Sequence, residues 1–335
     1  MIQIDDKPEQ TIKHKLIDNS IKQTDCYSIS FNQKSSIMVS ACQTDIKIWK
    51  FAEGKIKEDQ TLKGHHSFIY CIIYSKYCDA FLSGSQDCTI RLWKLVQQNE
   101  WKSSQPYLEH RNTITCLALN QSENEMVSGS SDNTIVVWKI NFIQNELSYL
   151  YKLEKHQGTV RALDYNFSSN ILVSCGRDKS IIVWQKDQEE KWQFHQIVNN
   201  KIEDEGMKIK FLKDDQFIWV PQDHKYDFIS VFENQNNHFV EIENKKINLI
   251  KNEQCNDYWY FPVFHIKERN LIVVRHKFHL YIIGERKNGY FHILDSINCK
   301  TWSIYGSLTV NGSYLVYWDN INNSFSVYEL IINNF

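Results

Sequence analysis

The residues with the clearest chemical potential are a histidine, a serine and an aspartate, which recur together along the chain. In the first full copy they are His65, Ser83 and Asp87. These types suit a nucleophilic serine activated by a histidine that an aspartate orients. They also suit a structural role, because a buried turn aspartate needs hydrogen-bond donors such as histidine and the indole N–H of tryptophan.

Repetition favours the structural role. Each copy ends in a tryptophan six residues after the aspartate, and the full sets are His65, Ser83, Asp87 and Trp93; His110, Ser128, Asp132 and Trp138; and His156, Ser174, Asp178 and Trp184. An active site rarely recurs three times in one chain. We therefore expect a structural polar network and no catalytic residues in these sets.

Four tryptophans set the period of the chain. Trp49, Trp93, Trp138 and Trp184 are 44, 45 and 46 residues apart, and each ends a short apolar segment. Two more apolar segments precede each tryptophan, and a more polar segment follows it. Alternating apolar segments between turn residues predict four strands per repeat.

The copies closely resemble WD40 repeats. The resemblance rests on Gly64-His65, on the histidines 110 and 156 at equivalent positions, and on the three turn aspartates. The family's period of roughly 40–45 residues and its four strands per blade also match. The resemblance implies that each histidine bonds the aspartate and the serine of its set, and that the serine bonds the tryptophan.

Weaker copies extend the repeat along the chain. The clear repeats span 55–94, 101–139 and 147–185, and degenerate repeats span 10–50, 192–233, 238–284 and 289–330. Seven repeats predict an all-β, seven-bladed WD40 propeller as a single domain over 1–335. Because a blade ends with the strand that opens the next sequence repeat, the segment near 10–17 should pair with the C-terminal blade and close the ring.

Repeat 6 contains three histidines, His265, His276 and His279. We expect its first strand within residues 258–264. We also expect His276 and His279 on one strand, where a spacing of three points their side chains to opposite faces. No shared metal is therefore predicted.

Composition excludes several classes of partner. The net charge of −2 gives no bulk attraction to nucleic acid or anionic membranes. No apolar run approaches the roughly 20 residues of a membrane helix, and the acidic first ten residues do not resemble a signal peptide. Nine scattered cysteines without a C-x-x-C pair indicate buried thiols in a reducing compartment. We expect a cytoplasmic or nuclear protein without cofactor, metal or membrane insertion.

The resemblance also implies a binding face. With strands a to d counted from the centre outward, WD40 proteins usually dock peptides or domains on the face that carries the d–a and b–c loops. The candidate residues of this face are His66, Phe68, Gln86, Arg111, Thr113, Ser131, Gln157, Thr159 and Arg177. Phe68 would be an exposed aromatic anchor, and Arg111 and Arg177 suit a carboxylate or phosphate.

The predicted function is a non-catalytic scaffold or adaptor that mediates protein–protein interactions within a multiprotein complex. One alternative comes from residues 175–198, which are similar to part of the WD40 subunit of the cytosolic iron–sulfur cluster assembly and targeting complex. Such an adaptor binds no cluster itself. Another alternative is an enzyme with a site in the central channel, but the inner strands read as apolar with serine and tyrosine. A phosphoinositide-binding propeller would need paired arginines, which the sequence lacks.

Overall fold

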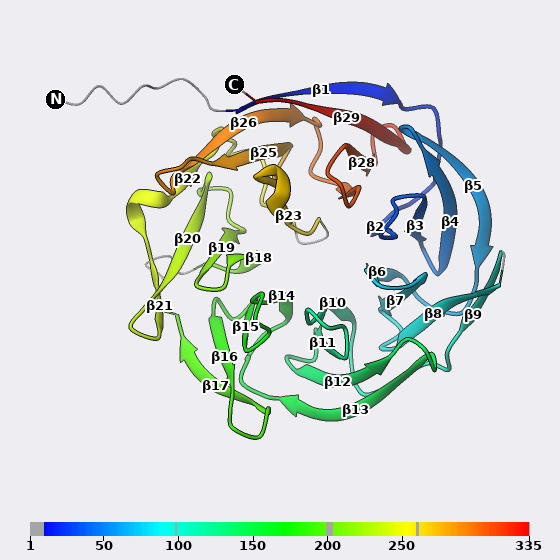
Figure 1. Cartoon of the computed structure of the whole chain (residues 1–335), viewed down its shortest axis with the longest axis horizontal. Helices are drawn as coiled ribbons and strands as arrows, with labels where there is room; N and C mark the ends of the chain where they lie inside the picture. Colours follow the sequence, from blue (N-terminus) through cyan, green and yellow to red (C-terminus); the bar gives the residue numbers. More distant parts are fainter. Residues whose placement is uncertain (1–9, 98, 199–203, 259–260, 335) are drawn as a thin grey trace.

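The protein is a ring of seven β-sheets whose innermost strands face a common axis (Figure 1). The structure is a computed structural model that describes residues 10–97, 99–198, 204–258 and 261–334. Over these residues the only helical segments are two 3-10 turns, η1 (Glu243–Lys245) and η2 (Lys267–Arg269). The predicted seven-bladed all-β propeller is confirmed. The first nine residues, which contributed to the expectation of no signal peptide, lie outside this range.

Blades 1 to 4 are four-stranded antiparallel sheets formed by consecutive strands. Blade 1 consists of β2 (Ile29–Phe31), β3 (Ile37–Cys42), β4 (Asp45–Ala52) and β5 (Lys55–Leu62). Blade 2 consists of β6 (Ile69–Tyr74), β7 (Ala80–Ser85), β8 (Ile90–Gln97) and β9 (Glu100–Ser103). Blade 3 consists of β10 (Ile114–Leu119), β11 (Glu125–Ser130), β12 (Ile135–Asn141) and β13 (Glu146–Leu153). Blade 4 consists of β14 (Val160–Tyr165), β15 (Ile171–Gly176), β16 (Ile181–Lys186) and β17 (Trp192–Ile197).

Blades 5 to 7 keep this pattern with local changes. Blade 5 consists of β18 (Gly206–Lys213), β19 (Gln216–Pro221), β20 (Phe228–Gln235) and β21 (His238–Glu241), and β22 (Ile247–Asn248) also pairs with β20. Blade 6 consists of β23 (Phe264–Ile266), β24 (Leu271–His276), β25 (His279–Glu285) and β26 (Phe291–Asn298). Blade 7 consists of β27 (Ile304–Leu308), β28 (Tyr314–Asp319), β29 (Ser324–Asn334) and the N-terminal β1 (Gln10–Asp18).

The N-terminal strand closes the ring. β1 runs antiparallel to β29, with Gln10 opposite Asn334 and Leu16 opposite Tyr328. Both strands lie side by side at the outer edge of blade 7 (Figure 1). The first and last described segments therefore share one sheet, as the offset between sequence repeat and blade predicts.

The hydrophobic core lies between neighbouring blades. Leu82 and Ile90 of blade 2, for example, belong to one buried cluster with Met126 and Trp138 of blade 3. The second strand of each of these blades is the most buried, which explains its continuous apolar sequence with small residues. Gly84 in β7 has a specific role, since a Cβ there would lie 2.5 Å from Ile114 of the next blade.

Blade 6 departs from the sequence-based expectations. We expected its first strand within 258–264, of which residues 259–260 lie outside the described residues; the innermost described strand is β23, which starts at Phe264. His276 and His279 are not on one strand: they end β24 and begin β25, and they pair across a tight turn. The prediction failed because the turn between these strands has only two residues, and Lys277 takes a left-handed conformation with φ 53°.

Candidate functional site

The structure brings the four residues of each predicted set together. In blade 2, His65 Nδ1 lies 2.9 Å from Asp87 Oδ2, and His65 Nε2 lies 2.7 Å from Ser83 Oγ. Trp93 Nε1 donates to the same serine oxygen at 2.8 Å. Since a carboxylate only accepts hydrogen bonds, His65 Nδ1 is the donor to Asp87.

Blades 3 and 4 repeat this geometry closely. The histidine–aspartate distances are 2.9 Å for His110 and 2.7 Å for His156. The tryptophan–serine distances are 2.8 Å from Trp138 to Ser128 and 2.9 Å from Trp184 to Ser174. The histidine–serine distances are 2.8 Å in blade 3 and 2.7 Å in blade 4.

Each aspartate of these sets also fastens two loops to each other. Asp87 Oδ2 accepts the backbone N–H of His66 in the d–a loop, and its Oδ1 accepts both the N–H and the hydroxyl of Thr89 in the b–c loop. Burial raises the pKa of Asp87, but the hydrogen bonds from His65 and Thr89 outweigh it and hold that pKa well below its usual value. The Asp87 carboxylate thus holds the d–a loop and the b–c loop of blade 2 in position.

Blade 1 retains only part of this arrangement. Trp49 Nε1 donates to Ser40 Oγ at 2.9 Å, and Ser40 Oγ donates to Gln23 Oε1 at 3.1 Å. The buried Gln23 thus occupies the place that histidine has in blades 2 to 4. No Gly-His signal marks this position in the sequence, so sequence reasoning missed it.

Blades 5 and 6 are joined by a different polar group, which we call the Asp257 cluster. It comprises Asp257, Lys208, Arg275, Lys277 and Asp227. Asp257 is fully buried; it forms ion pairs with Lys208 and with Arg275 NH2, the latter at 3.1 Å, and accepts the backbone N–H of Lys277. Lys277 Nζ in turn lies 2.7 Å from Asp227 Oδ1.

The electrostatics of the cluster favour an ionised Asp257. Burial raises the pKa of its carboxyl group, but the charges of Arg275 and Lys208 outweigh burial and hold that pKa far below its usual range. The same opposition lowers the pKa of Asp227 to about 2, with hydrogen bonds from His276 and Lys277 outweighing burial. Asp257 lies in the long d–a loop before blade 6, so these ion pairs hold that loop against both blades.

The nine predicted binding residues all lie on the face of the d–a and b–c loops, which we call the loop face. Backbone bonds join the two loops in each blade: Gln86 donates to Phe68, Ser131 to Thr113, and Arg177 to Thr159. Three of the nine predicted binding residues, Thr113, Ser131 and Thr159, are half-buried. The other six are exposed, and they are His66, Phe68, Gln86, Arg111, Gln157 and Arg177. Arg177 Nε lies 3.7 Å from Glu205 Oε1, so an intramolecular carboxylate already neighbours this predicted anion-binding arginine.

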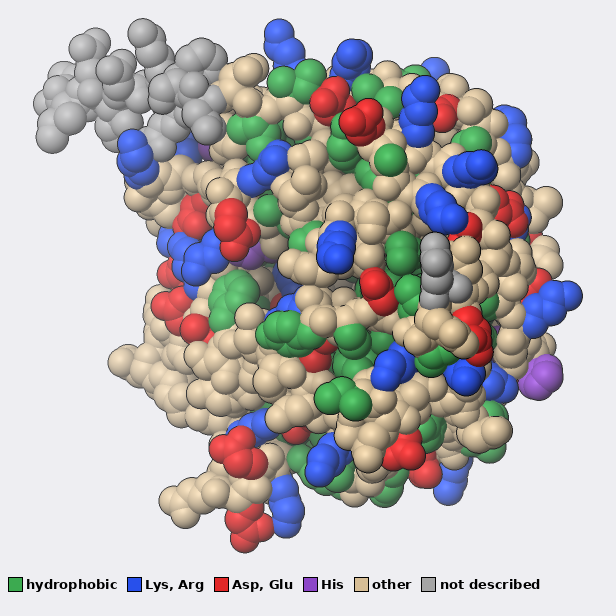
Figure 2. Space-filling model, turned by 45° about the vertical axis from the view of Figure 1, so that its right-hand side comes forward, with side chains coloured by type: hydrophobic (Ala, Val, Ile, Leu, Met, Phe, Trp, Pro, Cys, Tyr) green, Lys and Arg blue, Asp and Glu red, His purple; other side chains and the backbone are tan. Residues whose placement is uncertain are grey.

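The loop face carries a group of aromatic residues, of which only Phe68 was predicted from the sequence. The ring of Phe68 lies 5.5 Å from that of Tyr27, which in turn lies 5.6 Å from Tyr70 and 5.5 Å from Tyr305. These residues come from blades 7, 1 and 2 and belong to no repeat motif, so no sequence pattern indicates that they meet. Charges of both signs are interspersed over the surface seen in Figure 2.

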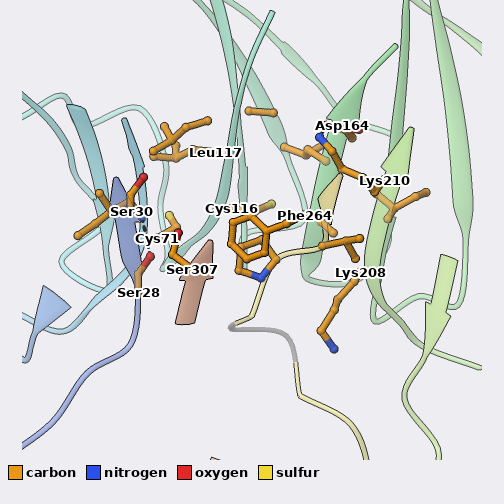
Figure 3. Close-up of a pocket in the computed structure, with 18 of the residues that line it drawn as sticks. Ser28, Ser30, Cys71, Cys116, Leu117, Asp164, Lys208, Lys210, Phe264 and Ser307 are labelled. Carbon is orange, nitrogen blue, oxygen red and sulfur yellow. Dashed lines mark hydrogen bonds and ion pairs between the residues drawn. The ribbon is translucent and has the colours of Figure 1, made fainter. Parts of the chain in front are cut away.

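The axis of the ring holds a cavity of about 410 Å³ (Figure 3). Contrary to expectation, the inner strands of blades 4 and 5 place charges there: Lys210 pairs with Asp164 at 2.7 Å, and Arg161 also lines the cavity and pairs at 2.8 Å with Glu205, which precedes β18. In Figure 3 Lys210 points toward Asp164, whereas Lys208 points away from it. These charges were overlooked because each strand also carries apolar residues on its other face.

Over the described ranges, no group of three or more His, Cys, Asp or Glu side chains is arranged to hold a metal. His265 lines the axial cavity, and burial together with Lys210 lowers its pKa to about 4. The nine cysteines are free thiols, and burial raises the pKa of Cys116 to about 12. No helix in the described part of the chain has the length and apolarity to span a bilayer.

Comparison with known proteins agrees with this geometry. The family model of the WD domain, G-beta repeat, matches residues 56–94, 101–139 and 147–185. The chain contains WD40 repeats. The three matched segments contain the three complete His–Ser–Asp–Trp sets.

Similarity to curated proteins covers only a small part of the chain. Over 69 residues it is 32% identical to the human serine-threonine kinase receptor-associated protein, covering 21% of this chain and 19% of that protein. Over 67 residues it is 33% identical to the zebrafish intraflagellar transport protein 122 homolog, covering 20% of this chain and 6% of that protein. The match thus spans about a fifth or less of the length of these relatives.

Proposed function

We propose that this WD40-repeat protein is a non-catalytic scaffold or adaptor that holds other proteins on its loop face within a multiprotein complex. The observation that carries the proposal is the exposed Phe68, whose ring adjoins Tyr27 and whose d–a loop is held in place by Asp87. Anchored aromatic side chains on rigid loops provide large contact area at low entropic cost.

A comparative affinity capture tests the proposal. The bait is the full chain, and the variant Phe68→Ala combined with Arg111→Ala removes an aromatic and a charged group from the loop face. The matched control is Ile143→Ala, because Ile143 is 85% exposed in a c–d loop on the opposite face. We expect the control to retain the captured partners and the loop-face variant to lose them, measured by quantitative mass spectrometry.

The same experiment separates the alternatives. Recovery of iron–sulfur cluster assembly proteins would assign the adaptor role that residues 175–198 suggest, with Arg177, Asp178, Trp184 and Trp192 as the similar positions. Partners lost equally from both variants, or turnover of a small molecule without any stable partner, would contradict the scaffold proposal.

A further inference from the structure

The loop face contains a second cavity, of about 290 Å³, next to Phe68. We call it the aromatic pocket. Its lining residues come from the loops and strands of four blades and are Asp25, Tyr27, Tyr70, Tyr258, Trp302, Ser303, Tyr305, Trp318 and Asn320. Six of these nine residues are aromatic. Sequence reasoning could not find the pocket, because its members lie up to 295 positions apart and belong to no repeat motif.

The aromatic walls are held by one another and by the backbone. The rings of Tyr258 and Trp302 lie 4.8 Å apart, and those of Tyr305 and Trp318 lie 5.9 Å apart. Trp318 Nε1 donates to the carbonyl of Gln23 at 2.8 Å, which fixes the indole. Trp302 is 41% exposed, so part of this wall remains open to solvent. Ring faces attract cations, and rings that are already fixed lose little entropy on binding.

The charge of the lining is negative. Asp25 is the one carboxylate among the nine, which include no lysine, arginine or histidine, and its Oδ2 accepts the Nε2–H of Gln43 at 2.7 Å, which orients the carboxylate. Arg275 adjoins the pocket and donates to the carbonyl of Trp302, and the Asp257 carboxylate, which it shares with Lys208, offsets part of its charge at 3.1 Å. Ser303 and Asn320 add further hydrogen-bond acceptors.

We propose that the aromatic pocket binds the guanidinium group of an arginine on a partner protein. This inference rests on the proposed function, because it assigns the chemistry of a partner on the same face. A guanidinium stacks on aromatic rings, carries five N–H donors and is more weakly hydrated than an ammonium. It therefore uses both the ring faces and the Asp25 carboxylate, whereas an apolar side chain would bring no donor for the acceptor sites of that carboxylate that Gln43 leaves open.

Binding of short peptides to the purified full chain tests the inference. The probe is a capped pentapeptide with a central arginine, and the comparison peptides carry citrulline, lysine or trimethyl-lysine at that position. We expect the arginine peptide to bind about tenfold more tightly than the citrulline peptide, because citrulline keeps the shape but loses the charge. Isothermal titration calorimetry measures the affinities, and tryptophan fluorescence follows Trp302.

Two variants and one control locate the binding. Asp25→Asn and Trp302→Ala should each weaken the arginine peptide about fivefold or more, whereas Ile143→Ala should leave its affinity unchanged. A thermal melt of each variant verifies that it is folded. A citrulline or lysine peptide that binds as well as the arginine peptide, or arginine binding that survives both substitutions, overturns the inference.

The two proposals fail in different ways. If the arginine peptide does not bind at millimolar concentration but Phe68→Ala with Arg111→Ala still releases the captured partners, the arginine inference is wrong and the scaffold proposal stands. If the variant Phe68→Ala with Arg111→Ala captures the same partners as the unsubstituted chain, the scaffold proposal fails, whether or not the arginine peptide binds.

Discussion

The d–a loops of blades 2 to 4 and the long loop between blades 5 and 6 are held in place by different polar groups. In blades 2 to 4 each d–a loop is tied to its own b–c loop by one aspartate and one histidine, as for Asp132 and His110. In blades 5 and 6 a single aspartate, Asp257, holds a long loop against Lys208 of one blade and Arg275 of the next. The first solution is local and repeated, whereas the second is unique and spans a blade boundary. A unique group has no second copy to compensate for its loss, and this difference can be tested.

The largest effect is expected for Asp257→Ala. The substitution leaves Arg275 and Lys208 buried without their shared carboxylate, and breaking a buried ion pair from one side costs about 3–5 kcal/mol. Urea denaturation followed by tryptophan fluorescence measures the loss. Asp215→Ala is the matched control, because Asp215 is exposed in blade 5, the blade of Lys208, and its substitution should cost less than about 0.5 kcal/mol. A loss as small as that of the control would show that the cluster does not hold blades 5 and 6.

A smaller effect is expected for Asp132→Ala. The backbone N–H of Arg111, the Thr134 hydroxyl and His110 lose their acceptor, at a cost of about 1–3 kcal/mol. Asp87→Ala and Asp178→Ala should cost similar amounts, since their blades have the same geometry. Asp132→Asn, which keeps one acceptor oxygen, should lower the melting temperature less than Asp132→Ala. An unchanged melting temperature for all three alanine variants would contradict the structural role of the sets.

The smallest effect is the change of the Asp132 contribution with pH. Hydrogen bonds from His110 and Arg111 outweigh burial and lower the pKa of Asp132 in the folded state. A depressed pKa stabilises the folded state above the unfolded pKa of about 3.9 and loses that contribution as the pH falls toward the folded value. The stability difference between the wild type and Asp132→Ala should therefore be constant from about pH 5 to 7 and smaller at pH 3. A difference that grows on acidification would reverse the assignment.

The contrast also explains what the sequence could predict. The tryptophan period and the turn aspartates were sufficient for the blade count, the closure by β1 and the composition of three polar sets, because a repeated contact leaves a repeated pattern. Gln23, which replaces histidine in blade 1, leaves no such pattern. Asp257 meets Lys208 and Arg275 across 49 and 18 positions in segments that occur once. The aromatic pocket is unpredictable for the same reason, since Tyr27 and Tyr305 become neighbours only when the ring closes.

The clasp between β1 and β29 has a mechanical consequence. Gln10 at the start of one strand is paired with Asn334 at the end of the other, so a force pulling these two residues apart acts on the last bridge of an antiparallel ladder. Such a force breaks the hydrogen-bonded pairs between β1 and β29 one after another from this end, instead of loading all of them at once. Under tension applied through these two positions the ring would open first at this seam in blade 7, while blades 2 to 4 would yield only later.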